Sequence, residues 1–164
     1  MSLFRRFLVV QALLLWQGGF LFYAAVVIPV GSGVLGSWSQ GTVTRHVTNW
    51  TNLIGAVALV ILAWDQWANT TDRCRRLRWG LWAVMGAGLV ALVLLHSVLA
   101  AYVDGTAENG TSFADFYLRH RIYLYIASIQ WVASLGYVAA MLRAWTFSPS
   151  PPASGGEGVR LALA

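Results

Sequence analysis

The chain contains no lysine, a single cysteine (Cys74) and only 10% charged residues among its 164 amino acids. Soluble domains carry charged residues at about 25% of positions, and disordered chains combine high charge with low hydrophobicity. Because 58% of this sequence is hydrophobic, both classes are excluded. One cysteine also excludes an internal disulfide. The fold must therefore be built from apolar segments without a covalent cross-link.

All 11 basic residues are arginines, and the formal net charge is +5. Nucleic-acid-binding domains gather their basic residues on one face. Here the arginines stand at the ends of apolar segments, which is typical of topology signals in membrane proteins. The distribution predicts a lipid bilayer as the surroundings of the chain and no nucleic acid as its partner.

Four uncharged apolar stretches have the length that a membrane span requires, roughly 20 residues. They run from Phe7 to Val30, from Val47 to Trp64, from Trp79 to Val103 and from Ile122 to Leu142. We expect Pro29 to end the first helix, and the fourth helix to begin early, at Phe113. Residues 1–147 are thus predicted to form a four-span membrane domain, and residues 148–164, rich in Pro, Ser and Gly, a flexible cytoplasmic tail.

The arginines also predict the orientation, because cytoplasmic loops carry the excess of basic residues. Eight lie on one side of the predicted spans and three on the other, the three being Arg45, Arg119 and Arg121. Residues 31–46 and 104–121 are therefore expected outside, and both termini in the cytoplasm. The expected fold is an all-α, antiparallel four-helix transmembrane bundle in the inner (plasma) membrane of the cell.

Polar side chains inside the spans call for partners, since an unpaired polar group in a bilayer costs several kcal/mol. Gln17 and Gln130 fall near the midpoints of the first and fourth spans, so we expect their amides to bridge these helices. Near the inner boundary, Asp65 is expected to form an ion pair with Arg78 or Arg73. On the fourth helix one stripe should face the bundle; it comprises His120, Tyr123, Ala127, Gln130, Ser134 and Tyr137.

The three histidines of the chain, His46, His96 and His120, all lie in the predicted outer half. Imidazoles bind copper, zinc and haem iron, and their second nitrogen commonly meets a carboxylate. These histidines are thus candidate ligands for one metal ion or haem, provided that a tilted helix or a late-starting span brings His96 to the depth of the other two. The surrounding outer pocket is predicted to contain Arg45, Asn49, Asn52, Arg119 and Tyr123.

Two segments resemble small four-span bacterial membrane proteins of unknown function. They are LLLWQGGFLFYAAVVIP, from Leu13 to Pro29, and FADFYLRHRIYLYIASIQW, from Phe113 to Trp131. The outward histidines are more distantly similar to those of copper-resistance-D membrane domains. The first resemblance implies a four-helix membrane bundle, and the second implies copper handling at His46, His96 and His120.

Three functional hypotheses follow. The leading one is a non-catalytic accessory or scaffold subunit of a larger membrane complex, because the sequence contains no nucleophilic triad, no glycine-rich phosphate loop and no carboxylate pair within a span. The second is an outer-face protein that binds copper or haem through its histidines. The third is a small-molecule transporter or a membrane oxidoreductase. Other membrane protein subunits are expected partners under the leading hypothesis.

Overall fold

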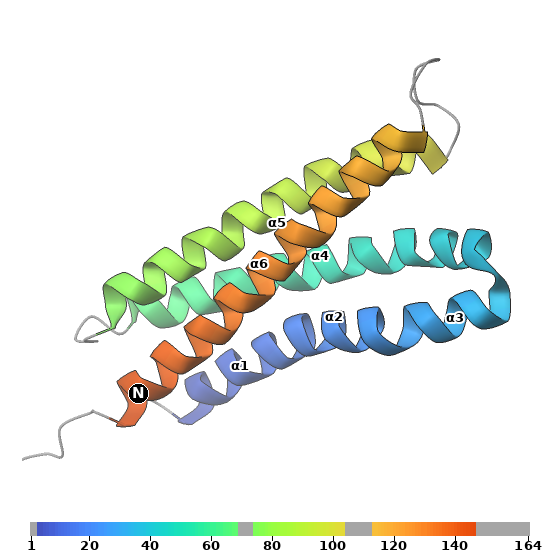
Figure 1. Ribbon diagram of the computed structural model, residues 1–164. Coiled ribbons are helices and arrows are strands. Elements are labelled where there is room, and N and C mark those ends of the chain that lie inside the picture. Colours follow the sequence, from blue (N-terminus) through green and yellow to red (C-terminus); the bar gives the residue numbers. More distant parts are fainter. Residues whose placement is uncertain (1–2, 69–73, 104–112, 147–164) are drawn as a thin grey trace, which may run out of the picture.

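The computed structural model describes residues 3–68, 74–103 and 113–146 (Figure 1). Within these ranges the chain has four helices long and apolar enough to cross a membrane: Leu3–Leu35, Ser39–Trp67, Arg75–Ala100 and Tyr117–Thr146. The prediction of an all-helical chain with four membrane-capable helices is thereby confirmed. The predicted tail, 148–164, and the outer residues 104–112 lie outside the described residues.

The first helix, which we call helix 1, is continuous but irregular. It consists of α1 (Leu3–Leu13), the π-helical segment η1 (Leu14–Gly18), α2 (Gly19–Phe22), a second π-helical segment η2 (Tyr23–Val27) and α3 (Ile28–Leu35). The expectation that Pro29 ends the helix is wrong. Pro29 lies in the first turn of α3, directly after η2, and the wider turns of η2 absorb the irregularity that its missing N–H creates. The helix ends instead at Gly36, which has a φ of 79°.

The predicted outer loop over residues 31–46 is also helical on both sides of Gly36. Helix α4 (Ser37–Trp67) begins ten residues before the predicted span. Its polar first turns are stabilised locally, because the Thr44 hydroxyl donates to the Gln40 carbonyl oxygen at 2.8 Å. The hydroxyl of Tyr23, on helix 1, donates to Thr44 Oγ1 at 3.1 Å, and Gln40 Nε2 donates to the Tyr23 hydroxyl at 3.3 Å. These bonds join the first turns of α4 to helix 1.

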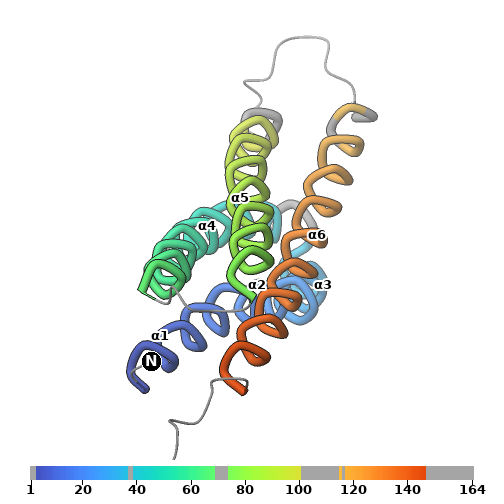
Figure 2. Tube along the Cα trace, turned by 90° about the vertical axis from the view of Figure 1, so that its left-hand side faces the viewer, coloured from blue at the N-terminus to red at the C-terminus, as the bar shows by residue number. Residues whose placement is uncertain are grey.

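The remaining helices are α5 (Arg75–Val103) and α6 (Phe113–Thr146), the latter beginning at the predicted residue. Helix α4 contacts helix 1 and α5, and α5 packs along α6. The start of α1, the end of α4, the start of α5 and the end of α6 lie at the same end of the molecule, which we call the inner end (Figures 1 and 2). Toward the opposite, outer end, the pair α5 and α6 diverges from α3 and α4 (Figure 1).

The hydrophobic core lies in the inner half of the molecule. It joins residues of all four helices: Val9, Ala12, Leu13, Trp16, Ala58, Leu59, Leu62, Met85, Leu89, Ala133, Tyr137 and Met141. In this core the ring of Trp16 packs on Gly55, where an added Cβ would lie 2.5 Å from Trp16 Nε1. Along the stripe predicted on α6, burial likewise decreases from the inner half toward the outer end. Its inner members, from Ala127 to Tyr137, are buried, whereas Tyr123 is half-buried and His120 is exposed.

Candidate functional site

A buried carboxylate, Asp65, lies at the centre of the inner end. Its side chain is 0% exposed and contacts two arginines. Arg78 Nη2 on α5 donates to Asp65 Oδ2 at 2.5 Å. Arg5 Nε on α1 lies 3.0 Å from Asp65 Oδ1. The structure therefore brings together the predicted inner pair, Asp65 and Arg78, and adds Arg5 to it.

The fourth helix reaches this ion pair through an aromatic side chain. Arg78 Nη2 donates a second hydrogen bond, 2.9 Å long, to the hydroxyl of Tyr137 on α6. The same guanidinium lies 5.1 Å from the centre of the Tyr137 ring. We call Arg5, Asp65, Arg78 and Tyr137 the inner cluster. Because each member belongs to a different helix, the inner cluster links helix 1, α4, α5 and α6 at one point.

The charged members of the inner cluster depend on one another for charge compensation. Two guanidinium groups share one carboxylate, and both Asp65 and Arg78 are almost fully buried. A buried ion pair adds little net stability compared with apolar side chains, but removing one partner leaves an uncompensated buried charge. With its carboxylate enclosed and paired on both oxygens, Asp65 joins α4 to helix 1 and α5.

A second polar contact crosses the middle of the bundle. Gln130 Nε2 on α6 donates to the carbonyl oxygen of Met85 on α5 at 2.9 Å. The Gln130 side chain lies beside Gly88, where an added Cβ would be 3.5 Å from Gln130 Cβ, an ordinary van der Waals contact. The expected interhelical contact of Gln130 is thus made with the backbone of α5 rather than with Gln17. Gln17 is itself buried, on η1.

The structure does not gather the three histidines. Among the described residues, no group of three or more His, Cys, Asp or Glu side chains could hold a metal ion. His46 and His120 are exposed and His96 is half-buried. Two causes separate them: the helices diverge toward the outer end, and His46 points about 100° away from Arg45, the residue of α4 that faces His96. The shared metal or haem site predicted at His46, His96 and His120 therefore has no supporting geometry here.

Parts of the predicted outer pocket are nevertheless close together. Arg45 on α4 lies near enough to His96 on α5 for an electrostatic interaction. The Tyr123 hydroxyl on α6 is hydrogen-bonded to the side chain of Thr48 on α4. Of the other predicted members, Asn49 is exposed, whereas Asn52 and Arg119 are half-buried. These contacts tie α4 to the pair α5 and α6 beyond the core.

Sequence reasoning missed two members of the inner cluster, Arg5 and Tyr137, in this role. The arginine was interpreted as a topology signal and the tyrosine as one residue of a bundle-facing stripe. The signal that could have found them is depth: Arg5, Asp65, Arg78 and Tyr137 all fall at the same boundary once the four spans are aligned in alternating directions. A buried aspartate at that depth requires a cationic partner.

Length and composition thus place the chain in the class of multi-pass helical membrane proteins. Comparison with known proteins found no matching family model, no matching curated protein and no matching solved structure.

Proposed function

We propose that this protein is a non-catalytic accessory subunit that packs against other subunits of a larger membrane complex. In this proposal the four spans form an antiparallel bundle, with the inner end and both termini in the cytoplasm. The resemblance to small four-span bacterial membrane proteins agrees with this arrangement and remains a prediction.

The observation that carries the proposal is how the buried polar groups are used. The carboxylate of Asp65, the guanidinium of Arg78 and the amide of Gln130 each bond to a neighbouring helix. Such contacts stabilise a fold in a bilayer. Meanwhile the chain buries only 17% to 39% of the most apolar window of each span. Large apolar faces are therefore left for lipid and for partner helices.

One exposed surface favours a protein partner over lipid. Gly18 and Gly19, near the middle of helix 1, are exposed, and a Cβ added at either would meet nothing within 4 Å. Gly18 is the last residue of η1 and Gly19 follows it, and π-helical segments within α-helices often mark functional positions. Adjacent glycines allow another helix to approach closely enough for backbone contact. We therefore place the partner interface on this face of helix 1.

Purification from native membranes in a mild detergent tests the proposal. We expect the wild-type chain to carry a partner subunit in fixed stoichiometry. Replacing Gly18 and Gly19 with Leu should displace that partner, because the larger side chains hold the backbones apart. The matched control is Gly33→Leu, on the same helix and likewise exposed with open space around it.

Quantitative mass spectrometry of the purified samples provides the measurement. Retention of the partner by Gly33→Leu and its loss from the double glycine variant would support the proposed interface. A wild-type chain recovered alone from the mildest detergent, or a partner that the double variant keeps, would contradict it.

A further inference from the structure

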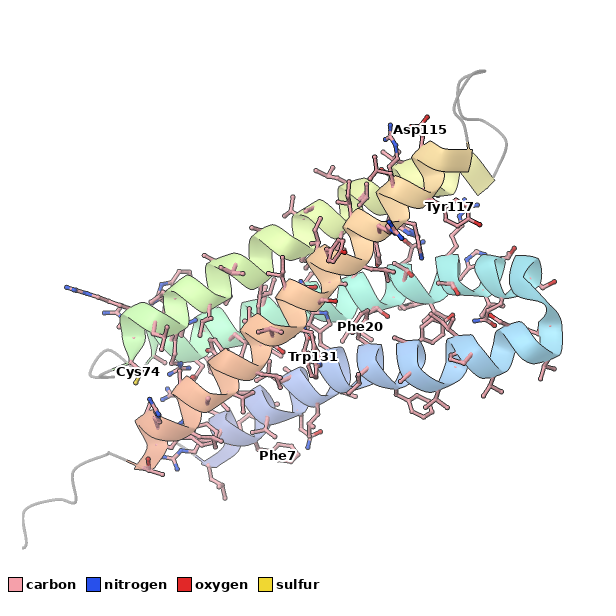
Figure 3. All side chains as sticks on the ribbon, viewed as in Figure 1. Phe7, Phe20, Cys74, Asp115, Tyr117 and Trp131 are labelled. Carbon is pink, nitrogen blue, oxygen red and sulfur yellow. The ribbon has the colours of Figure 1, made fainter. Side chains whose placement is uncertain are left out.

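A second arginine at the inner end, Arg6, has a setting unlike that of Arg5. Its guanidinium carbon lies 5.0 Å from the centre of the Trp145 ring. The start of α1 and the end of α6, which carry these two residues, lie at the same end of the molecule (Figure 3). Both side chains are half-buried. Among the described residues, the Arg6 guanidinium contacts the Trp145 ring, and no carboxylate oxygen lies within 4 Å of the Arg6 guanidinium.

Two N–H groups of this stacked pair lack an acceptor among the described residues. Arg6 Nε and Trp145 Nε1 are each buried, and neither makes a hydrogen bond. A buried indole N–H ordinarily has a partner, because leaving such a donor unpaired is unfavourable. An unpaired indole N–H beside an unneutralised guanidinium indicates a missing acceptor that carries negative charge.

The excess of positive charge around Arg6 and Trp145 also indicates a missing anion. Six described arginines lie at the inner end: Arg5, Arg6, Arg75, Arg76, Arg78 and Arg143. The described acidic residue at this end is Asp65, and both of its oxygens already face Arg5 and Arg78. The excess positive charge therefore requires a counter-ion from outside the described chain, at the level where lipid headgroups lie.

We propose that Arg6 and Trp145 form a binding site for the phosphate of an anionic membrane lipid. The phosphate oxygens accept hydrogen bonds from the Arg6 guanidinium and from Trp145 Nε1, and the acyl chains lie in the seam between α1 and α6. Arginine suits this task because its planar donor groups match phosphate geometry. Basic pockets between helices are a common mode of headgroup binding. The site does not depend on the proposed accessory role.

Native mass spectrometry of the detergent-solubilised protein tests the site, with phosphatidylglycerol, phosphatidylcholine or inorganic phosphate added in parallel. We expect one phosphatidylglycerol to be retained in preference to phosphatidylcholine, and no retention of inorganic phosphate. Arg6→Gln should lower the affinity for phosphatidylglycerol about tenfold or more, because a charged hydrogen bond is lost. Trp145→Phe keeps an aromatic ring but removes the N–H, and should lower the affinity about two- to tenfold.

The matched control is Arg76→Gln, which removes one positive charge from an exposed side chain at the same end. It should leave the affinity for phosphatidylglycerol unchanged, and thermal unfolding of all three variants checks that each is folded. Equal loss of affinity in Arg76→Gln and Arg6→Gln would mean that general positive charge attracts the lipid, which overturns the site. Equal retention of the two lipids, retention of inorganic phosphate instead, or an unchanged Trp145→Phe would also overturn it.

Discussion

Replacing Asp65 with Asn is expected to destabilise the fold by about 3 to 5 kcal/mol, the cost typical of removing one partner from a buried ion pair. Asparagine preserves the shape of the side chain but leaves Arg5 and Arg78 without the carboxylate that both contact. Because Arg78 is 1% exposed, its charge cannot be compensated by water without opening the helix contacts. Unfolding by SDS titration, followed by tryptophan fluorescence, measures the change.

Two further variants make this first prediction specific. Arg76→Gln removes an exposed arginine at the start of α5, and should alter stability by no more than about 0.5 kcal/mol. Replacing Asp65 and Arg78 together with Leu should be less harmful than Asp65→Asn alone, because no buried charge is left on α4 or α5. Arg5 is 14% exposed and can extend toward the headgroups. Wild-type stability of Asp65→Asn would rule out the inner cluster as the link between the helices.

The second large effect is expected at Tyr137. Its side chain is 0% exposed, belongs to the core and accepts the hydrogen bond from Arg78. Tyr137→Ala creates a cavity where α6 meets the other helices, and should cost about 3 to 5 kcal/mol. Tyr137→Phe removes only the hydroxyl, and should cost about 1.5 to 3 kcal/mol, the range for hydrogen bonds to charged groups.

The control for Tyr137 lies on the same helix. Tyr125 is 69% exposed, so Tyr125→Ala should change the free energy of unfolding by no more than about 0.5 kcal/mol. The same SDS titration compares the three variants. A Tyr137→Ala protein as stable as Tyr125→Ala would contradict the packing described for the inner half.

The helices could be predicted from the sequence because apolar length alone decides whether a segment can cross a bilayer. The ends of the helices could not. Pro29 ordinarily stops a helix, yet the preceding π-helical segment η2 accommodates it. The segment from Gly31 to His46 lies between two predicted spans and was therefore expected to be a connection outside the membrane. Its helical form is accompanied by hydrogen bonds from Tyr23 to Thr44 and from Gln40 to Tyr23, which join residues 21 and 17 positions apart and are not visible in the local sequence.

Some contacts of the candidate sites could likewise be predicted from the sequence, and others could not. Asp65 could be matched with Arg78 because a short connection brings the ends of two successive helices together. The approach of Arg5 and Tyr137 depends on how all four helices pack, which local sequence does not specify. The histidine hypothesis required a tilted helix or a late-starting span to bring His96 to the depth of His46 and His120. The divergence of α5 and α6 from α4 separates them instead.

Reporter insertions in the connections give the most direct test of the four-span arrangement with its inner end in the cytoplasm. Two reporter types are used, one that is active only in the cytoplasm and one that is active only outside it. At Asp72 and after Ala164 the cytoplasmic type should be active, and at Gly36 and Glu108 the external type. The measurement compares both reporter types at each position in intact cells. An externally active reporter at Asp72, or the same sidedness at Gly36 and Asp72, would contradict the arrangement.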